Sequence, residues 1–142
     1  MTRMSFVLPC VPTPQARARH TVRGGHSVTY KSEQQEANER TLDALLARHA
    51  PEVPLSGAVF LEFRALFPPP KSAGKKARAA MLRGTEAHTK KPDLDNLTKQ
   101  LKDAMTRLQF WNDDRQVVRL VCEKRYGEPG RWEVCVREMP EA

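Results

Sequence analysis

Two pairs of aspartates carry the residue types and spacing that could do chemistry in this chain. Asp93 and Asp95 stand in the run Lys-Pro-Asp-Leu-Asp-Asn-Leu, and Asp113 and Asp114 stand in Trp-Asn-Asp-Asp-Arg-Gln. Lys99 follows Asp95 by four residues, which is about one helical turn. Carboxylates that are forced together repel each other, and a divalent cation relieves that repulsion. A small acidic cluster in a basic protein is what a metal-dependent enzyme acting on a polyanion would need.

Magnesium suits such a cluster because it prefers oxygen ligands and keeps several of its waters, so two or three aspartates suffice. Bound to a scissile phosphate, the ion would neutralise charge and supply an activated water. Lys99 would place a fixed positive charge near the phosphate as negative charge develops. The residues therefore fit metal-assisted hydrolysis of a phosphodiester.

Each of these residues also has a purely structural explanation. Asp93 is a good N-cap for a following helix, and Asp95 in the first turn would complement the helix dipole. Lys99 could simply pair with Asp95 at i+4, and Asp113 and Asp114 suit a turn before a strand. The acids alone do not decide between a catalytic site and well-capped helices.

A helix must position the first pair. Five apolar residues recur at spacings of three and four and predict its buried stripe: Leu94, Leu97, Leu101, Met105 and Leu108. Asp95, Lys99 and Asp103 fall on another face. This helix would span about 22 Å. Asp114 can return to its beginning only if the next strand runs antiparallel beside it; otherwise the helix is shorter or kinked, or a second subunit completes the site.

The remaining pattern predicts an α+β fold, with a mixed or antiparallel sheet packed with about three helices in a single domain over residues 1–142. The expected strands are Ser5–Leu8, a hairpin within His20–Tyr30, Ala58–Phe67, and the pair Gln116–Lys124 and Arg131–Arg137, which we expect to form a hairpin through Glu128-Pro129-Gly130. The expected helices, besides the one over 94–108, run from a Ser32 N-cap to about His49 and from Ser72 to Leu82, with Gly84 as the stop.

The charge balance points to a polyanionic partner. The 142 residues include 24 lysines and arginines against 17 acids, a formal net charge of +7, which favours nucleic acid over membrane. Two basic segments are candidate phosphate contacts rather than merely solvated surface: Arg17, Arg19 and Arg23 in an acid-free N-terminal stretch, and Lys71, Lys75, Lys76, Lys90 and Lys91 leading into the first acidic pair.

Cysteine and hydropathy patterns limit the alternatives. The three cysteines form no C-x-x-C, so we expect small buried residues in a reducing cytoplasm. The four histidines have no zinc-site spacing. The longest apolar stretch, 57–67, is interrupted by Glu62 and Arg64, so no membrane span is expected, and the N-terminal apolar run is too short for a signal peptide.

At its acidic motifs the chain resembles a known family. The resemblance rests on Pro92-Asp93-Leu94-Asp95-Asn96-Leu97 with Lys99, and on Phe110-Trp111-Asn112-Asp113-Asp114-Arg115-Gln116-Val117-Val118. Together these motifs resemble the RusA-type Holliday-junction resolvases, crossover junction endodeoxyribonucleases often carried by phages and prophages. The P-D…(D/E)-x-K nucleases do not fit, because no D-x-K or E-x-K follows.

The resemblance implies roles for individual residues. Asp93, Asp95 and Asp114 correspond to catalytic metal-binding aspartates and Lys99 to an essential lysine, with Asp113 as the alternative acid of the second motif. It implies a RusA-like fold, Mg²⁺ (with Mn²⁺ as a substitute) and no small-molecule cofactor. It also implies a homodimer that makes paired nicks in four-way-junction DNA. A two-fold dimer presents two equivalent sites to two strands of like polarity.

Two other functions stay open at this point. The first is a basic nucleic-acid-binding module without catalysis, in which the acids are caps and turn residues. The second is a nuclease for other branched DNA, such as flaps or replication forks. The first would bind duplex and junction similarly, whereas either nuclease would cut only with a divalent metal.

Overall fold

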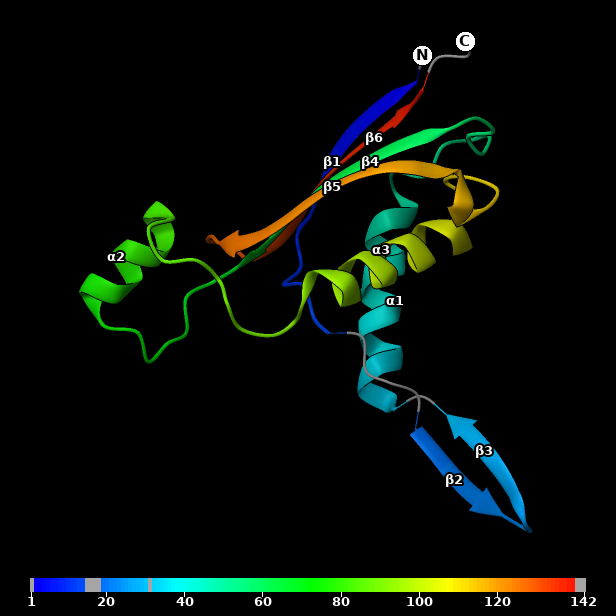
Figure 1. Cartoon of the computed structure of the whole chain (residues 1–142), viewed down its shortest axis with the longest axis horizontal. Helices are drawn as coiled ribbons and strands as arrows, with labels where there is room; N and C mark the ends of the chain where they lie inside the picture. The colour runs from blue at the N-terminus through cyan, green and yellow to red at the C-terminus, as the bar shows by residue number, and fades with distance from the viewer. Residues whose placement is uncertain (1, 15–18, 31, 140–142) are drawn as a thin grey trace.

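A computed structural model describes residues 2–14, 19–30 and 32–139 of the chain; for residues 19–23 and 26–30 it describes the backbone only. The elements in chain order are β1 (Arg3–Leu8), β2 (Arg19–Arg23), β3 (His26–Tyr30), α1 (Glu33–Ala47), β4 (Val59–Phe67), α2 (Lys75–Arg83), α3 (Leu94–Arg107), the short 3₁₀ helix η1 (Asp114–Gln116), β5 (Val117–Tyr126) and β6 (Arg131–Glu138). Three helices and a four-stranded mixed sheet confirm the α+β prediction (Figure 1).

The sheet has the strand order β1-β6-β4-β5, with β4 in its interior. β4 pairs antiparallel with β6 and parallel with β5, and β1 pairs antiparallel with β6. The predicted hairpin between the last two strands is therefore wrong, because β4 lies between them. Every second residue of β4 is buried, so this strand takes a protected position with a neighbour on each side, and β5 is left as an edge.

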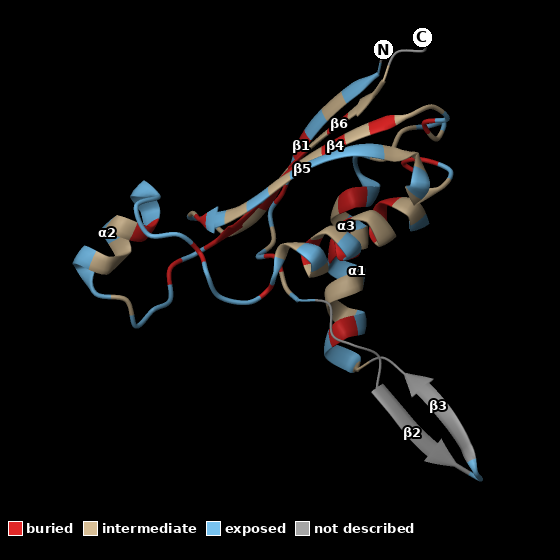
Figure 2. Cartoon of the chain, in the orientation of Figure 1, coloured by how far each residue is buried: buried red, intermediate tan, exposed pale blue. Residues whose placement is uncertain are grey.

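Helices α1 and α3 cover one face of the sheet and enclose the core (Figures 1 and 2). The apolar stripe predicted for α3 is largely buried there, with Leu97, Leu101 and Met105 fully enclosed. It packs with Leu42 and Leu46 of α1 and with alternate side chains of the strands. The pleat turns the other strand residues to the opposite face, and no helix covers that face in the part of the chain that the structure describes (Figure 1).

Local capping signals set the helix ends. Ser32 accepts a hydrogen bond from the Gln35 backbone N–H at 3.2 Å and begins α1 as predicted. Gly84 ends α2 at φ 84°, a left-handed conformation that glycine adopts at no steric cost. α2 begins at Lys75 rather than Ser72, because the Ala73 N–H bonds to the Pro70 carbonyl at 3.0 Å in a preceding turn.

Two parts of the chain extend away from the sheet in Figure 1. One is the β2–β3 hairpin, whose register pairs Arg19 with Tyr30 and confirms the predicted hairpin at the level of the backbone. The other is α2, which an ion pair between Arg78 and Glu128 connects to the loop after β5. Among the described residues, no helix is long and apolar enough to cross a membrane.

The three cysteines are free thiols and only partly buried, whereas the sequence predicts buried residues. Cys10 and Cys122 pack against the edge of the core, and burial raises the pKa of the Cys10 thiol while a hydrogen bond with Trp132 opposes that rise. Cys135 lies on β6 in register with Ser5 and Glu62, on the uncovered face of the sheet.

Candidate active site

The first acidic pair lies at the beginning of α3, and its two members do different things. Asp93 is the N-cap: its Oδ1 accepts a hydrogen bond from the Asn96 backbone N–H at 2.8 Å. Asp95 lies in the first turn and is exposed. Lys124 of β5 fixes the preceding segment by donating to the carbonyls of Lys90 and Pro92, the latter at 2.9 Å. β5 therefore runs antiparallel beside α3: its last residues lie next to the beginning of the helix, whereas Asp114, just before its first residue, lies toward the helix end rather than returning to the beginning.

The second acidic pair begins η1, where the same division of labour recurs. Asp113 is the N-cap and its Oδ1 accepts a hydrogen bond from the Arg115 backbone N–H at 2.9 Å. Gln116 closes a capping box by accepting from the N–H groups of Asn112 and Asp113, both at 2.8 Å. Its Nε2 donates to the carbonyls of Leu55 and Gly57 at 2.8 and 3.0 Å. One side chain thus ties the turn to the loop before β4.

A buried tryptophan anchors the same turn to the end of α3. Trp111 is fully enclosed, and its indole N–H donates to Thr106 Oγ1 at 2.8 Å. Next to it, the Phe110 carbonyl accepts from the Leu55 N–H at 2.9 Å. An aromatic side chain with its polar handle satisfied is an effective anchor, so the position of Asp114 relative to α3 is well defined.

A hollow of about 320 Å³ lies between α3 and β5 and brings the two motifs together. Thr98 Oγ1 and Cys122 Sγ lie 3.9 Å apart across its floor. The residues that line it are Leu94, Asp95, Thr98, Lys99, Lys102, Asp103, Asp114, Leu120 and Cys122. Three predicted site residues, Asp95, Lys99 and Asp114, therefore share one concave surface. Lysine and carboxylates around a hollow could hold a phosphodiester between a cation-binding side and a basic side.

Asp103 is a residue of this hollow that the sequence reasoning did not name as a site residue. It lies 3.3 Å from Lys99 Nζ through its Oδ2, in an i,i+4 ion pair. The predicted partner of Lys99 was Asp95, four residues earlier. Asp95 and Asp103 both lie four residues from Lys99 and could both pair with it, and in the structure Lys99 pairs with Asp103. The Lys99 side chain stays 70% exposed, so its ammonium remains available to a ligand.

Asp93 and Asp113 do not line the hollow, because each is turned to its helix N-terminus. Among residues 2–14, 19–30 and 32–139, no three His, Cys, Asp or Glu side chains are grouped closely enough to hold a metal ion. Carboxylate oxygens are the ligands Mg²⁺ prefers, so the donor type fits. In one copy of the chain the acidic side chains are therefore spread along a surface and do not converge on a single ion position.

The predicted phosphate contacts are only partly placed by the structure. Lys71, Lys75, Lys76, Lys90 and Lys91 are all exposed, on and around α2 and in the segment leading to α3. Arg17 lies outside the described residues. Arg19 and Arg23 are placed by their backbone alone, at the two ends of β2. The basic segment 71–91 is thus joined in sequence to the first acidic turn.

β5, the wall of the hollow, is an edge strand with an apolar surface that the sequence reasoning missed. Val118, Leu120 and Val121 are 64%, 41% and 45% exposed. Exposed apolar residues on an unpaired edge mark a surface that another chain can cover. Alternation along 116–124 suggested a half-buried strand, and only the observed order of strands shows that this one has a free edge.

A buried histidine lies in the segment that leads to the first acidic turn. His88 is 7% exposed and its ring stacks on Phe67, with centroids 4.3 Å apart, and packs edge-on against Tyr126. Burial, followed by the nearby Lys124 ammonium, lowers the pKa of His88 below its usual 6.5. The imidazole is therefore held neutral and acts as a core aromatic group.

Comparison with known proteins identifies similarity to one family. The profile of the family described as Endodeoxyribonuclease RusA matches residues 9–137. The uncharacterized protein YqaN of Bacillus subtilis (strain 168) is 32% identical over 141 residues, covering 98% of this chain and 99% of that protein. The crossover junction endodeoxyribonuclease rusA of Lactococcus phage r1t is 45% identical over 51 residues, 36% of this chain and 39% of that protein.

Proposed function

The chain belongs to the RusA endodeoxyribonuclease family, and from this premise we propose that it resolves four-way DNA junctions by paired, Mg²⁺-dependent nicks. The observation that carries the proposal is the shared hollow: Asp95 and Asp114, 19 positions apart in sequence, line one surface together with Lys99. The similar phage protein is named for crossover junctions, which supports this choice of branched DNA.

The chain's own residues divide the work of hydrolysis in this proposal. Asp93, Asp95 and Asp114 would hold Mg²⁺, which supplies charge neutralisation and an activated water when bound. Lys99 would stabilise the negative charge that develops on the phosphate, since its ammonium is exposed at the hollow. Asp103 would hold Lys99 in place through their 3.3 Å pair. Mn²⁺, which also prefers oxygen ligands, would substitute for Mg²⁺.

A homodimer is part of the proposal for two reasons. One copy does not group three acidic ligands within the described residues, so a neighbouring copy would supply a further group. On the edge strand β5, Leu120 lines the hollow and Val118 is exposed two residues earlier, and a second copy would bury these apolar side chains. A two-fold axis would then present two equivalent sites to two strands of the junction.

The basic segment 71–91 would contact phosphates of the junction arms. Its lysines are exposed, and Lys90 and Lys91 directly precede the first acidic turn. Contacts of this kind carry no sequence information and weaken as salt rises. Arg17, Arg19 and Arg23 remain proposed contacts on the strength of their sequence alone.

The test is a cleavage titration with purified chain on a synthetic four-way junction, a flap and a linear duplex, with Mg²⁺, Mn²⁺ or EDTA. We expect paired nicks on the junction with either metal and none in EDTA. Asp95→Asn should bind the junction without cutting it, whereas Glu36→Gln, which removes an exposed carboxylate on α1, should cut like the wild type.

The same titration separates the rival functions. Cutting of flaps in preference to junctions would assign the chain to other branched DNA. Binding of junction and duplex with equal affinity, with no cutting in Mg²⁺ or Mn²⁺, would make it a basic nucleic-acid-binding module and would contradict the proposal.

A further inference from the structure

The uncovered face of the sheet carries a transverse row of three arginines and a phenylalanine. Arg3 of β1 pairs in register with Arg137 of β6, Arg137 with Phe60 of β4, and Phe60 with Arg119 of β5. The four side chains therefore stand side by side across the whole sheet. Adjacent strands lie about 4.8 Å apart, so the row is about 14 Å wide.

The rest of this face is neutralised by ion pairs. Arg64 lies 2.9 Å from Glu123 and 3.8 Å from Glu133. Arg125 and Arg131 pair with the same two glutamates, at 3.6 and 3.1 Å. The Arg64 pairs join β4 to its two neighbouring strands, the other two pairs lie within β5 and β6, and the charges of these five side chains largely offset each other.

The row itself is not neutralised. Within the described part of the chain, Arg3, Arg119 and Arg137 have no carboxylate within 4 Å: none of them takes part in the ion pairs given for those residues. Unpaired guanidinium groups on a flat surface indicate a site for phosphate groups, because arginine presents forked N–H donors that can bind a phosphate through two hydrogen bonds.

Phe60 keeps two of these guanidinium groups in place. The Cζ of Arg137 lies 4.5 Å from the centre of its ring, and the Cζ of Arg119 lies 5.0 Å from it. A cation over an aromatic ring is attracted by the electron density of the ring face. The ring thus limits the freedom of two long side chains before any ligand arrives, which reduces the entropy lost on binding.

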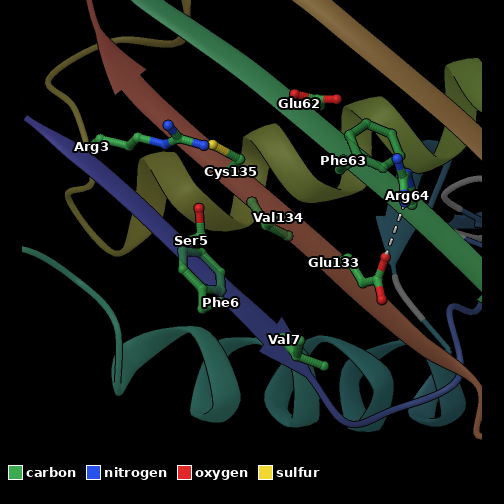
Figure 3. Close-up of a pocket in the computed structure, with 10 residues that line it drawn as sticks. All are labelled: Arg3, Ser5, Phe6, Val7, Glu62, Phe63, Arg64, Glu133, Val134 and Cys135. Atoms are coloured by element: carbon green, nitrogen blue, oxygen red, sulfur yellow. Dashed lines mark ion pairs between the residues drawn. The ribbon is translucent and has the colours of Figure 1, made fainter.

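A hollow of about 380 Å³ adjoins the row on the same face. Figure 3 shows it from the uncovered side, with the Arg3 side chain running over β6 toward Cys135 and the Arg64–Glu133 ion pair at the other end. Ser5 and Val7 of β1 also line it. The hollow therefore has an unpaired cation at one end and paired charges at the other.

We propose that the row Arg3–Arg137–Phe60–Arg119 binds the sugar–phosphate backbone of one DNA strand that lies across the uncovered face of the sheet. The inference rests on the proposed function for the identity of the polyanion. Leu120 faces the active-site hollow, and Arg119, the preceding residue of the same edge strand, faces the row. A width of about 14 Å corresponds to about four nucleotides of one strand at 3.4 Å each.

Charge argues for DNA rather than for a second copy on this face. The face has an excess of basic side chains, six arginines against three glutamates: Arg3, Arg64, Arg119, Arg125, Arg131, Arg137, Glu62, Glu123 and Glu133. Two such faces would repel each other across a two-fold axis, whereas a phosphate backbone complements them.

The test measures binding of a fluorescently labelled four-way junction in EDTA, by anisotropy, from about 50 to 200 mM salt. Arg119→Gln/Arg137→Gln removes two charges of the row. Arg64→Gln/Arg125→Gln removes two ion-paired charges of the same face and is the matched control. We expect the row variant to bind about tenfold or more weakly and its salt slope to fall by about two, which is about one for each phosphate that the protein no longer neutralises. The control should keep the wild-type slope.

Several results would overturn the inference. They are a row variant with wild-type affinity and slope, an equal loss in the control, displacement of DNA by inorganic phosphate at constant ionic strength, or a change of oligomeric state in the row variant by sedimentation. Because EDTA prevents cutting, binding is read independently of catalysis. A chain that never cuts but binds through the row would contradict the proposed function alone, and a chain that cuts normally without using the row would contradict this inference alone.

Discussion

The two acidic turns of this chain are built alike, although one begins a 14-residue helix and the other a single turn of 3₁₀ helix. In each, the first aspartate caps a helix through its own side chain, at 2.8 Å for Asp93 and 2.9 Å for Asp113. In each, a later aspartate, Asp95 or Asp114, lines the hollow between α3 and β5. The capping acid fixes the turn, and the second acid is thereby free for chemistry.

The turns differ in how they are held. The first is fixed from outside by a cation, since Lys124 of β5 donates to two carbonyls before it. The second is fixed by neutral groups, through the Gln116 amide and the Trp111 indole. A capping role and a ligand role are therefore separable in the second turn, where they fall on adjacent residues. In the first turn, Asp93 caps the helix and is also one of the proposed metal ligands.

The largest expected effect comes from replacing the two aspartates of the second turn one at a time. Asp114→Asn should reduce the rate of junction cutting more than about 100-fold, because loss of an outer-shell partner alone costs up to about that factor. Asp113→Asn, its matched control, should cut like the wild type, since asparagine caps as well as aspartate. The measurement is single-turnover cleavage in Mg²⁺. Equal losses in the two variants would show that the division between cap and ligand is wrong.

In the first turn, two substitutions of Asp93 separate stability from catalysis. Asp93→Asn should leave the free energy of unfolding unchanged within a few tenths of a kcal/mol, while Asp93→Ala should lower it by about 0.5–2 kcal/mol. If Asp93 is also a ligand, as proposed, both variants lose cutting. Denaturant unfolding and the cleavage assay measure the two properties. A fully active Asp93→Asn would leave Asp93 as a cap only.

A substitution of Gln116 tests whether the hydrogen bonds of its uncharged side chain are needed to hold the second turn. Gln116→Ala removes hydrogen bonds to Asn112, Asp113, Leu55 and Gly57, and we expect a loss of about 1–3 kcal/mol in unfolding free energy. Because Asp114 would then be less well placed, the cutting rate should fall while junction binding in EDTA persists. Unchanged cutting in a destabilised variant would show that the turn positions itself without this side chain.

The smallest expected effect is on the pH dependence of stability. It concerns His88, which lies in the segment before the first acidic turn and has no counterpart in the second. His88 has a folded-state pKa below its unfolded value of 6.5. Below pH 6.5 the unfolded chain binds a proton that the folded chain does not, so stability from this group is full above pH 6.5 and falls as pH decreases toward the folded pKa. His88→Phe, which keeps the ring stacking on Phe67, should flatten this part of the stability curve. Denaturant unfolding between pH 7 and pH 5 measures the difference, and parallel curves for the two proteins would contradict it.

Local signals in the sequence predicted most of the elements but not their arrangement. Ser32, Gly84 and Asp93 mark helix ends in the sequence because capping depends on the few residues around them. The parallel pairing of β4 with β5 was not predictable, because the choice of strand neighbours depends on how the whole core packs. The expected final hairpin failed for that reason: its loop carried suitable turn residues, but β4 occupies the intervening position.

The same distinction applies to the candidate site. That Asp95 and Lys99 share a helix face follows from a 3.6-residue period, and the hollow confirms it. Asp114 lines the hollow because of the path that the chain takes from α3 into β5. The sequence does not determine that path. Asp103 and the arginine row were missed, because the first depends on a side-chain choice between two i±4 partners and the second on a register across four strands.

β5 contributes alternate residues to two working surfaces, with Leu120 and Cys122 on the α3 side and Arg119 and Val121 on the other. The consequence concerns insertions and deletions. Adding or removing one residue between Arg119 and Leu120, beyond the register irregularity opposite Val59 and Phe60, would turn the residues that follow to the opposite faces and move Leu120 and Cys122 away from α3. In evolution this strand should therefore accept changes of residue far more readily than changes of length.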